Sequence, residues 1–205
     1  CWGGWEHPIH AVEAAPADVT LRLAMLLHDI GKPACKSTDE QGIDHFYGHP
    51  AVSAQMADEM LRALKFDSKT QERVLLLVER HDIQMPPRSQ VIRRWLNRLG
   101  PEAFFQLLEV KRADNMGQAP EKVQDRLVEL DEIKAKAEQI LAERQCLTLK
   151  DLAVDGRDVI AAGIEPGPEV GRVLEELLER VLSGEVPNER EVLLKLSGRS
   201  DKRDI

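Results

Sequence analysis

The spacing of apolar residues along the chain predicts a protein built from helices. Residues three and four apart share one face of a helix, and near the N-terminus such a stripe is formed by Leu21, Ala24, Met25, Leu27 and His28. Pro16-Ala17-Asp18 supplies a start for this helix, and Gly31-Lys32-Pro33 is expected to end it. Further helical periodicity covers 50–64, 69–82, 88–99 and 101–118, and a long charged helix is expected over 120–144.

Strands are not expected to contribute to the fold. The chain shows no sustained alternation of apolar and polar residues, and Asp155-Gly156 has flanks too short for a hairpin of paired strands. Residues 34–48 are polar and rich in turn-forming types, which predicts a loop. We therefore expect an all-α protein.

A change of composition near 145–150 divides the chain. Another amphipathic helix is expected over about 168–183, with an apolar face formed by Val170, Val173, Leu174, Leu177, Leu178 and Val181. Residues 197–205 are charged and small and are expected to fray. The expected division is a body at 1–118, a connecting helix at 119–145 and a small helical tail at 146–196.

Composition limits the class of protein further. Of the 205 residues 42% are hydrophobic but only 4% are aromatic, so the core must consist mostly of Leu, Val, Ile and Ala. The net charge of −8 argues against a surface that coats nucleic acid, although a local basic patch stays open. Cys1, Cys35 and Cys146 are too few and too scattered for a disulfide framework or a Cys-rich zinc site. Without an apolar run of roughly 20 residues or a signal peptide, we expect a cytoplasmic protein with no membrane partner.

The adjacent pair His28-Asp29 is the most informative candidate for chemistry. It lies in Met25-Leu26-Leu27-His28-Asp29-Ile30-Gly31-Lys32-Pro33. Both side chains are of metal-ligand type, and neighbours can bind one ion if the backbone leaves helical geometry, which Gly31 should permit. Lys32 could then hold a phosphate as a point charge. The alternatives are structural: a hydrogen-bonded core histidine, a helix-end carboxylate and a lysine at a helix C-terminus.

The order of His7, then His28-Asp29, then a distant Asp114 resembles the HD-domain superfamily of metal-dependent phosphohydrolases. The resemblance implies that these four residues bind a divalent ion. Two imidazoles and two carboxylates suit Ni²⁺, Mn²⁺, Co²⁺, Fe²⁺ or Zn²⁺, and Mg²⁺ remains an option. Asp114 has structural alternatives, which are an ion pair with Arg112 or the cap of a turn.

The same resemblance implies roles for histidines between the His-Asp pair and Asp114. His49 opens an expected helix and His81 closes one, so both can face one cavity and hold a second ion or a phosphate. Their alternatives are a helix cap for His49 and a solvent-facing helix end for His81. The expected catalytic residues are thus Asp29, Lys32, His49 and His81. Of the other histidines, His10 is expected to pack and His45 to lie in a loop.

Longer stretches resemble a narrower group, the bacterial tRNA nucleotidyltransferases, which comprise CCA-adding enzymes and poly(A)-polymerase-like relatives. The similar stretches are Trp5-Glu6-His7, 16–33, His45-Phe46-Tyr47-Gly48-His49, Ala51-Val52-Ser53-Ala54, Arg112-Ala113-Asp114, 151–160 and 163–171. Together they extend the resemblance over about 5–118 and 146–196. It implies an HD-domain helical bundle at 1–118, followed by the connecting helix and a tail that positions RNA.

The chain departs from the family pattern in two places. Gly48-His49-Pro50 stands where the family often has Gly-His-Glu, and no Gly-Ser followed by a paired Asp-x-Asp occurs. The chain begins Cys1-Trp2-Gly3 without a Met, so we expect a fragment whose nucleotide-adding head lies upstream. The family implies a divalent-metal-dependent phosphohydrolase for 2′,3′-cyclic phosphates, 2′-nucleotides or phosphomonoesters of nucleotides or RNA ends. The alternative is a non-catalytic body and tail that binds tRNA.

On so acidic a chain, contacts with tRNA must be local. One candidate surface is the basic cluster Arg88, Arg93, Arg94 and Arg98. Another is the helix start at Gly167-Pro168, where free N–H groups can hold a phosphate. The alternatives are a solvated helix face and an ordinary helix start. The sequence makes no prediction of oligomeric state.

Overall fold

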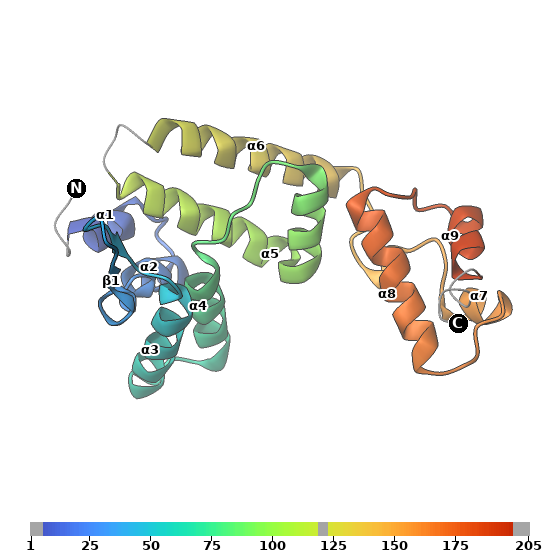
Figure 1. The fold of residues 1–205 in the computed structure, drawn as a ribbon, viewed down its shortest axis with the longest axis horizontal. Helices are drawn as coiled ribbons and strands as arrows, with labels where there is room; N and C mark the ends of the chain where they lie inside the picture. The colour runs from blue at the N-terminus through green and yellow to red at the C-terminus, as the bar shows by residue number, and fades with distance from the viewer. Residues whose placement is uncertain (1–5, 119–122, 199–205) are drawn as a thin grey trace. The chain divides into compact units, whose positions relative to one another are not determined.

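The structure, a computed structural model, describes residues 6–118 and 123–198. Helices make up most of these residues (Figure 1), which confirms the all-α prediction. The α-helices are α1 (Glu6–Ala14), α2 (Val19–Leu27), α3 (His49–Ala63), α4 (Ser68–Arg80), α5 (Ser89–Met116), α6 (Val123–Ala142), α7 (Gly156–Ala161), α8 (Pro168–Ser183) and α9 (Arg190–Ser197). The short elements are η1 (Lys32–Cys35), η3 (Leu149–Asp151), β1 (Ser37–Thr38) and β2 (Asp44–His45).

Helix ends follow local sequence signals. Asp18 caps α2, because its side chain accepts a hydrogen bond from the Leu21 N–H at 2.9 Å. The helix ends at Leu27, slightly before the predicted stop, so His28 and Asp29 lie in the turn that follows it. The bounds of α8 agree with the predicted 168–183, and Gly184 ends it in the left-handed region with φ 75°.

The predicted break between 99 and 101 appears as a kink inside α5. Gly100 has φ 74° and ψ 160°, which only glycine adopts easily, and Pro101 follows it. One of the boundaries between two compact units of the chain falls at this point. The first unit comprises Cys1–Met85 and Pro101–Lys134, and the second Pro86–Gly100 and Ala135–Ile205. The functional division predicted at 118 and 145 stays a prediction.

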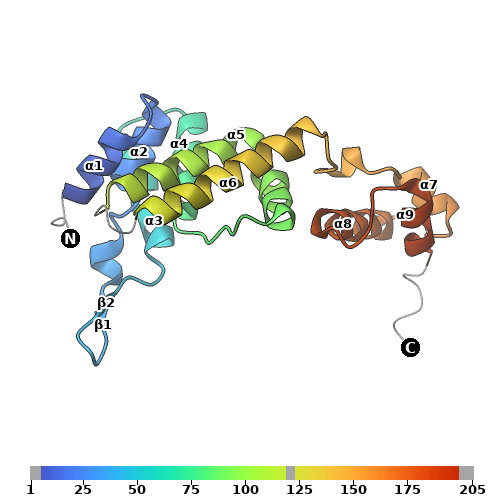
Figure 2. The ribbon, with the colours of Figure 1, turned by 90° about the horizontal axis from the view of Figure 1, so that it is seen from above.

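In the first unit, α1 packs against α2, and α2, α3 and α4 pack against one another. The second half of α5 runs alongside these helices (Figures 1 and 2). Large side chains in this core include Met25, Leu61, Leu77 and Phe104, each less than 2% exposed. Burial of one such side chain contributes about 1.5–3 kcal/mol. The second half of α5 runs beside the first half of α6, and an ion pair joins Arg112 to Asp131. The aliphatic core predicted from the composition therefore holds the elements that carry the candidate site.

The predicted loop at 34–48 contains a small antiparallel ladder that the sequence did not indicate. Ser37 pairs with His45 and Thr38 with Asp44. The Asp39 carboxylate holds the turn by accepting the N–H groups of Gln41 at 3.0 Å and Ile43 at 2.8 Å. This hairpin projects away from the helices of the first unit (Figure 2).

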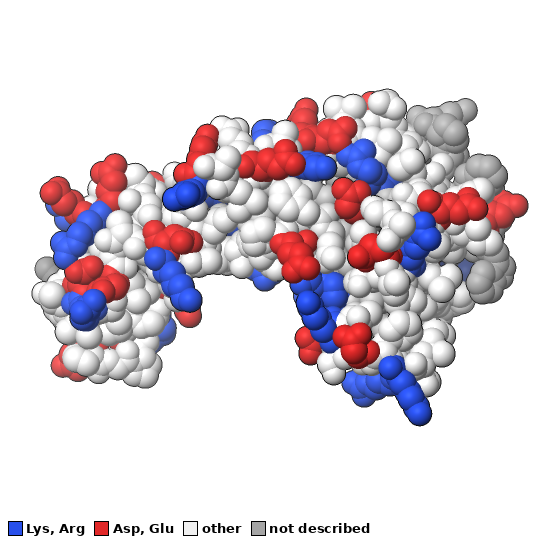
Figure 3. Space-filling model, turned by 180° about the vertical axis from the view of Figure 1, so that it is seen from behind, with Lys and Arg blue, Asp and Glu red and all other residues white. Residues whose placement is uncertain are grey.

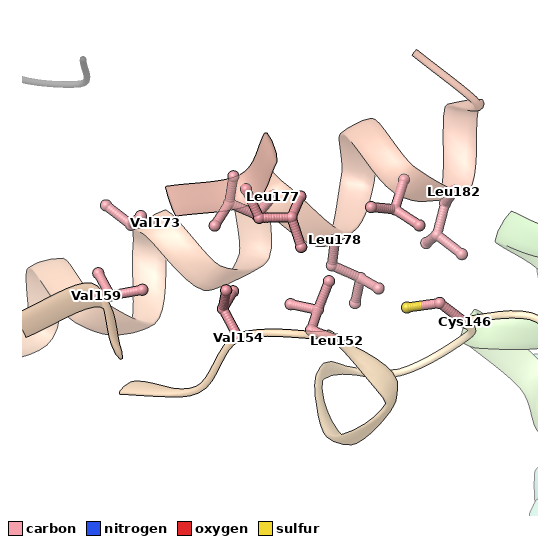
Figure 4. Packing of buried hydrophobic residues seen from close by; sticks show 10 residues of the cluster. Cys146, Leu152, Val154, Val159, Val173, Leu177, Leu178 and Leu182 are labelled. Carbon is pink, nitrogen blue, oxygen red and sulfur yellow. The ribbon is translucent and has the colours of Figure 1, made fainter. Parts of the chain in front are cut away.

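The second unit has its own aliphatic core (Figure 4). The helix α8 turns its apolar face onto η3, α7 and the segments between them. The buried members of this core are Cys146, Leu152, Val154, Val159, Val173, Leu177, Leu178, Val181, Leu182 and Leu193. The face predicted for α8 is thus largely the buried one, although Val170 and Leu174 are only partly buried.

The described surface is mixed in charge. Basic and acidic side chains are interspersed over the face shown in Figure 3. Two of the arginines predicted to contact RNA are engaged within the second unit: Arg93 donates to the Leu182 carbonyl at 2.9 Å, and Arg94 pairs with Glu179. No helix among the described residues is long and apolar enough to cross a membrane.

Candidate metal centre

The first unit brings together the side chains that the sequence predicts as ligands or catalytic groups. They come from the ends of separate helices: His7 from α1, His28 and Asp29 from the turn after α2, His49 from the start of α3, His81 from the end of α4 and Asp114 from α5. Because these residues are far apart in sequence, only the packing of the helices places them side by side. Their roles as ligands stay a prediction.

Asp29 lies at the centre of the cluster and belongs to two groups of potential ligands. Each group has its ligand atoms within 4.8 Å of one another. In the first group, His7 Nε2 lies 3.6 Å and His28 Nε2 3.2 Å from Asp29 Oδ2. Asp114 adjoins this group, with its Oδ1 3.0 Å from His7 Nε2 and 3.5 Å from His28 Nε2.

The second group uses the other oxygen of the same carboxylate. His49 Nε2 lies 3.4 Å and His81 Nε2 3.8 Å from Asp29 Oδ1. The two Nε2 atoms are only 3.2 Å apart. The two groups together offer imidazole and carboxylate donors of the kind that divalent transition metals prefer.

Backbone carbonyls orient all of these imidazoles. The Nδ1 atoms of His7, His28, His49 and His81 lie 2.6–2.9 Å from the carbonyls of Gly117, Met25, Phe46 and Val78, respectively. An Nδ1–H that donates to a carbonyl leaves the Nε2 lone pair of a neutral ring toward the cluster, as in histidines that bind metals. In that tautomer, the His49 and His81 lone pairs point toward each other across 3.2 Å. A proton or a cation between them is needed to offset their repulsion.

Burial makes the arrangement costly without a further partner. His28 is 1% exposed. Its Nε2 and Asp29 Oδ1 form no well-aligned hydrogen bond within the described part of the chain, although each lies 3.2–3.5 Å from an atom of the cluster. Buried polar groups without partners are rare in native proteins, and a bound ion is one established reason for them. The donor set and these orphaned atoms therefore fit a bound cation.

The charges of the cluster are strongly coupled. Burial alone would lower the pKa of His28, but Asp114 and Asp29 outweigh it and raise the pKa to about 9. Burial likewise opposes ionisation of Asp29 and Asp114, yet His28 holds the pKa of each carboxyl well below its usual range. Burial lowers the pKa of His81 to about 4, so its ring is neutral at pH 7. Without a metal, the cluster at pH 7 thus contains two ionised carboxylates, a protonated His28 and a neutral His81.

Other predicted residues occupy plainer positions. Lys32 donates to Asp29 Oδ2 at 2.6 Å, so its ammonium is next to the cluster and partly exposed. Arg112 pairs with Asp131 and leaves Asp114 facing the histidines. His10, which was expected to pack, is partly exposed on α1, with its Nδ1 3.3 Å from Glu13 Oε2. His45 is held by Asp39 in the hairpin, where a loop position was predicted.

The prediction that Gly31 lets the backbone leave helical geometry is wrong. Its φ of −81° and ψ of −14° are open to any residue, so no special backbone freedom is used there. The glycine instead allows close approach, since a Cβ at this position would lie 2.7 Å from Ser53 N and 2.9 Å from the His49 carbonyl oxygen. Its N–H also donates to Ser53 Oγ at 2.9 Å. Gly31 therefore joins the turn that carries Asp29 to the helix that begins at His49.

Sequence reasoning missed Lys111, which lies one turn before Asp114 on α5. Its ammonium donates to the carbonyls of His81 at 2.8 Å and Ile83 at 2.7 Å. It thereby ties the end of α4, which carries His81, to the helix that carries Asp114. The sequence shows only a lysine one turn before a predicted ligand. Its role could not be inferred until the structure placed the carbonyls of His81 and Ile83 beside it.

Comparison with known proteins agrees with the family resemblance. The profile of a family described as tRNA nucleotidyltransferase domain 2 matches residues 37–196. This chain belongs to the tRNA nucleotidyltransferase family. That result confirms the relationship predicted from the sequence motifs, whereas the HD assignment stays a prediction.

Two curated members of the tRNA nucleotidyltransferase family align with nearly the whole chain. A CC-adding tRNA nucleotidyltransferase of Thermus thermophilus is 34% identical over 198 residues, which cover 91% of this chain and 43% of the relative. An A-adding tRNA nucleotidyltransferase of Deinococcus radiodurans is 31% identical over 201 residues, which cover 91% and 44%. A multifunctional CCA protein of Azoarcus is 30% identical over 127 residues, covering 57% and 30%. The chain therefore spans less than half the length of these relatives.

Proposed function

We propose that this chain is the tRNA-contacting part of a tRNA nucleotidyltransferase. The observation that carries the proposal is the family match over 37–196, together with relatives whose names specify tRNA. The alignment with each of these two longer relatives covers 91% of this chain. Its contribution would be to hold tRNA for a nucleotide-adding domain that belongs to another part of the polypeptide.

Local basic residues on the second unit would supply the contacts with tRNA phosphates. Arg88 and Arg98 are exposed, and the Arg98 guanidinium lies 5.0 Å from the Trp95 ring centroid. Arg93 and Arg94 are already engaged with Leu182 and Glu179. The exposed pair is therefore the better choice for a test.

Binding of labelled tRNA, followed by fluorescence anisotropy over a range of KCl, tests this proposal. We expect a dissociation constant of about 10⁻⁶–10⁻⁴ M that rises with salt. Changing Arg88 and Arg98 together to Gln should reduce the salt slope by about 2, or one per phosphate contact. The matched control changes the exposed Arg62 and Lys69 of the first unit to Gln. Absence of binding at low salt, or identical slopes for the two double variants, would contradict the proposal.

A second function is favoured by the His/Asp cluster, which we propose is a divalent-metal phosphohydrolase centre. His7, His28, Asp29 and Asp114 would hold the ion, and His49 and His81 would take a second ion or a phosphate oxygen. When bound, a divalent ion supplies Lewis-acid chemistry that polarises a phosphate oxygen and makes water more acidic. The support is the convergence of the Nε2 atoms on Asp29, with orphaned polar atoms at the centre.

The remaining side chains would bind the substrate and move protons. Lys32, whose ammonium already touches Asp29, is placed to contact a phosphate oxygen as a point charge. When the second group holds no ion, the Nε2 of the neutral His81 ring would instead accept a proton from the attacking water. Attack on phosphorus forms one P–O bond and breaks the bond to the leaving oxygen, which takes up a proton. A 2′,3′-cyclic phosphate would thus yield a phosphomonoester.

Turnover of 2′,3′-cyclic nucleotides with Ni²⁺, Mn²⁺, Co²⁺, Fe²⁺, Zn²⁺ or Mg²⁺ tests this second function. Asp29→Asn should abolish turnover, because the shared carboxylate loses its charge. Asp39→Asn is the matched control, since Asp39 also contacts a histidine, His45 at 2.8 Å, but lies in the hairpin. Turnover that persists in Asp29→Asn or in excess chelator would contradict the assignment, as would no turnover with any of the metals.

A further inference from the structure

A polar cavity adjoins the His/Asp cluster on the side of α5 and α6. It has a volume of about 180 Å³, and His81 and Asp114 form part of its wall. Since both residues also belong to the cluster, a ligand in this cavity would lie against the candidate metal centre. All of its lining residues belong to the first unit.

The wall of the cavity carries one cation, Arg126, that forms no direct ion pair with a carboxylate among the described residues. Arg126 donates from its guanidinium to Asn115 Oδ1 at 3.3 Å and Gln118 Oε1 at 2.9 Å. Both acceptors are neutral amides, and among the described residues no ion pair includes Arg126. The guanidinium is therefore positioned by its neighbours while its charge stays available for an anion.

Hydrogen bonds fix the other cation of the lining. Lys111 lines the cavity, but its ammonium is taken up by the carbonyls of His81 and Ile83 at 2.8 and 2.7 Å. Lys111 is thus a positioning residue for the end of α4. This division leaves Arg126 as the better candidate for contact with a ligand.

The size and polarity of the cavity restrict what it can hold. Pockets for drug-sized ligands are about 300–1,000 Å³, so a cavity of about 180 Å³ suits a smaller group. Its charged lining includes Asp82, Lys111, Asp114, Arg126 and Glu129. A polar fragment such as a ribose phosphate fits this lining better than a flat nucleobase does.

We propose that this cavity is the substrate pocket of the metal centre, and that Arg126 binds a phosphate oxygen of a ribose-phosphate end. The proposal rests on the phosphohydrolase function proposed above. The nucleobase would lie outside the cavity, so hydrolysis should depend little on which base the substrate carries. Three carboxylates line the cavity against two cations, and one of those cations is engaged. An anion should therefore bind only after metal has offset the negative charge.

The test uses inorganic phosphate as the probe and the full chain loaded with Mn²⁺. Metal content is measured first, and phosphate binding is then measured by calorimetry with and without the metal. We expect phosphate to bind only to the metal-loaded protein. Arg126→Gln should bind it about tenfold more weakly or worse, as for loss of a charge-assisted hydrogen bond, and Arg126→Lys should recover part of that loss. Arg62→Gln, an exposed arginine on α3, is the control and should bind as the wild type does.

The outcomes separate this inference from the function on which it rests. If the wild type holds no metal, the proposed centre fails and the pocket fails with it. If the wild type holds metal but binds no phosphate, or if Arg126→Gln binds it as tightly as Arg62→Gln, the pocket assignment alone is overturned. Turnover of 2′,3′-cyclic nucleotides with the four bases gives a second readout. Similar KM values support the pocket, and a strong preference for one base contradicts it.

Discussion

Replacing Gly31 by alanine should damage both the stability of the first unit and its candidate metal centre. The added Cβ would lie 2.7 Å from Ser53 N, 2.9 Å from the His49 carbonyl oxygen and 2.9 Å from Ser53 Oγ. Two of these atoms belong to the backbone of α3 and cannot rotate away, so the start of that helix must shift. Overpacking of this kind costs about 1–3 kcal/mol.

Two further terms modify that cost. The shift also weakens the hydrogen bond from the Gly31 N–H to Ser53 Oγ, which is worth about 0.5–1.5 kcal/mol. In the opposite direction, alanine lowers the conformational entropy of the unfolded chain, which stabilises the fold by about 0.4–1 kcal/mol. We therefore expect Gly31→Ala to lower the free energy of unfolding by about 0.5–4 kcal/mol. Because His49 begins α3, metal binding should weaken as well.

Urea unfolding followed by circular dichroism measures this effect. The matched control is Gly171→Ala on α8, where an added Cβ meets no atom within 4 Å. That change should be neutral or stabilise the protein by up to about 1 kcal/mol, because alanine favours a helix over glycine. If Gly31→Ala is as stable as the wild type, the close approach of the Asp29 turn to α3 is refuted.

Two more predictions concern the charges around the cluster. His28 has a pKa of about 9 in the metal-free fold against 6.5 for a free imidazole. Its contribution to the free energy of unfolding should therefore be fully present below pH 6.5 and be lost as the pH rises to 9. Urea midpoints of the metal-free protein at pH 6 and 9 measure this loss, which the His28→Gln variant should not show. Lys111→Met should lower the free energy of unfolding by about 1–3 kcal/mol, because two carbonyls lose their donor. Urea unfolding measures it against the exposed Lys69→Met, and equal stability of the two variants would contradict the positioning role.

Much of the fold could be predicted because its signals are local. Asp18 marks the start of α2 in the sequence, and the Gly100-Pro101 pair marks the kink in α5. The apolar stripe of α8 fixes its bounds for the same reason. The hairpin at 37–45 escaped prediction because its turn is held by the Asp39 side chain and not by alternating apolar residues. The union of 86–100 with 135–205 in one unit depends on contacts distant in sequence, which periodicity does not report.

The residue types of the candidate site could be predicted from the sequence, but the hydrogen bonds that hold its helices together could not. Ligand-type residues such as His28 and Asp29 stand out in an apolar stretch, and the family resemblance adds their distant partners. The supporting contacts are made by ordinary residues: Ser53 accepts from Gly31, and Lys111 donates to two carbonyls. Such residues gain their roles only when separate helices meet. The cavity beside Arg126 could not be predicted for the same reason.

The most direct test of the proposed metal centre is anomalous diffraction from a crystal of the chain soaked in Co²⁺. We predict an anomalous peak between His7, His28, Asp29 and Asp114, at about 2.0–2.3 Å from His28 Nε2, as is usual for imidazole bound to such ions. A second, weaker peak beside His49 and His81 would fit the second group of ligands. No peak in the cluster, or a peak only beside exposed residues such as His45 and Asp39, would contradict the account.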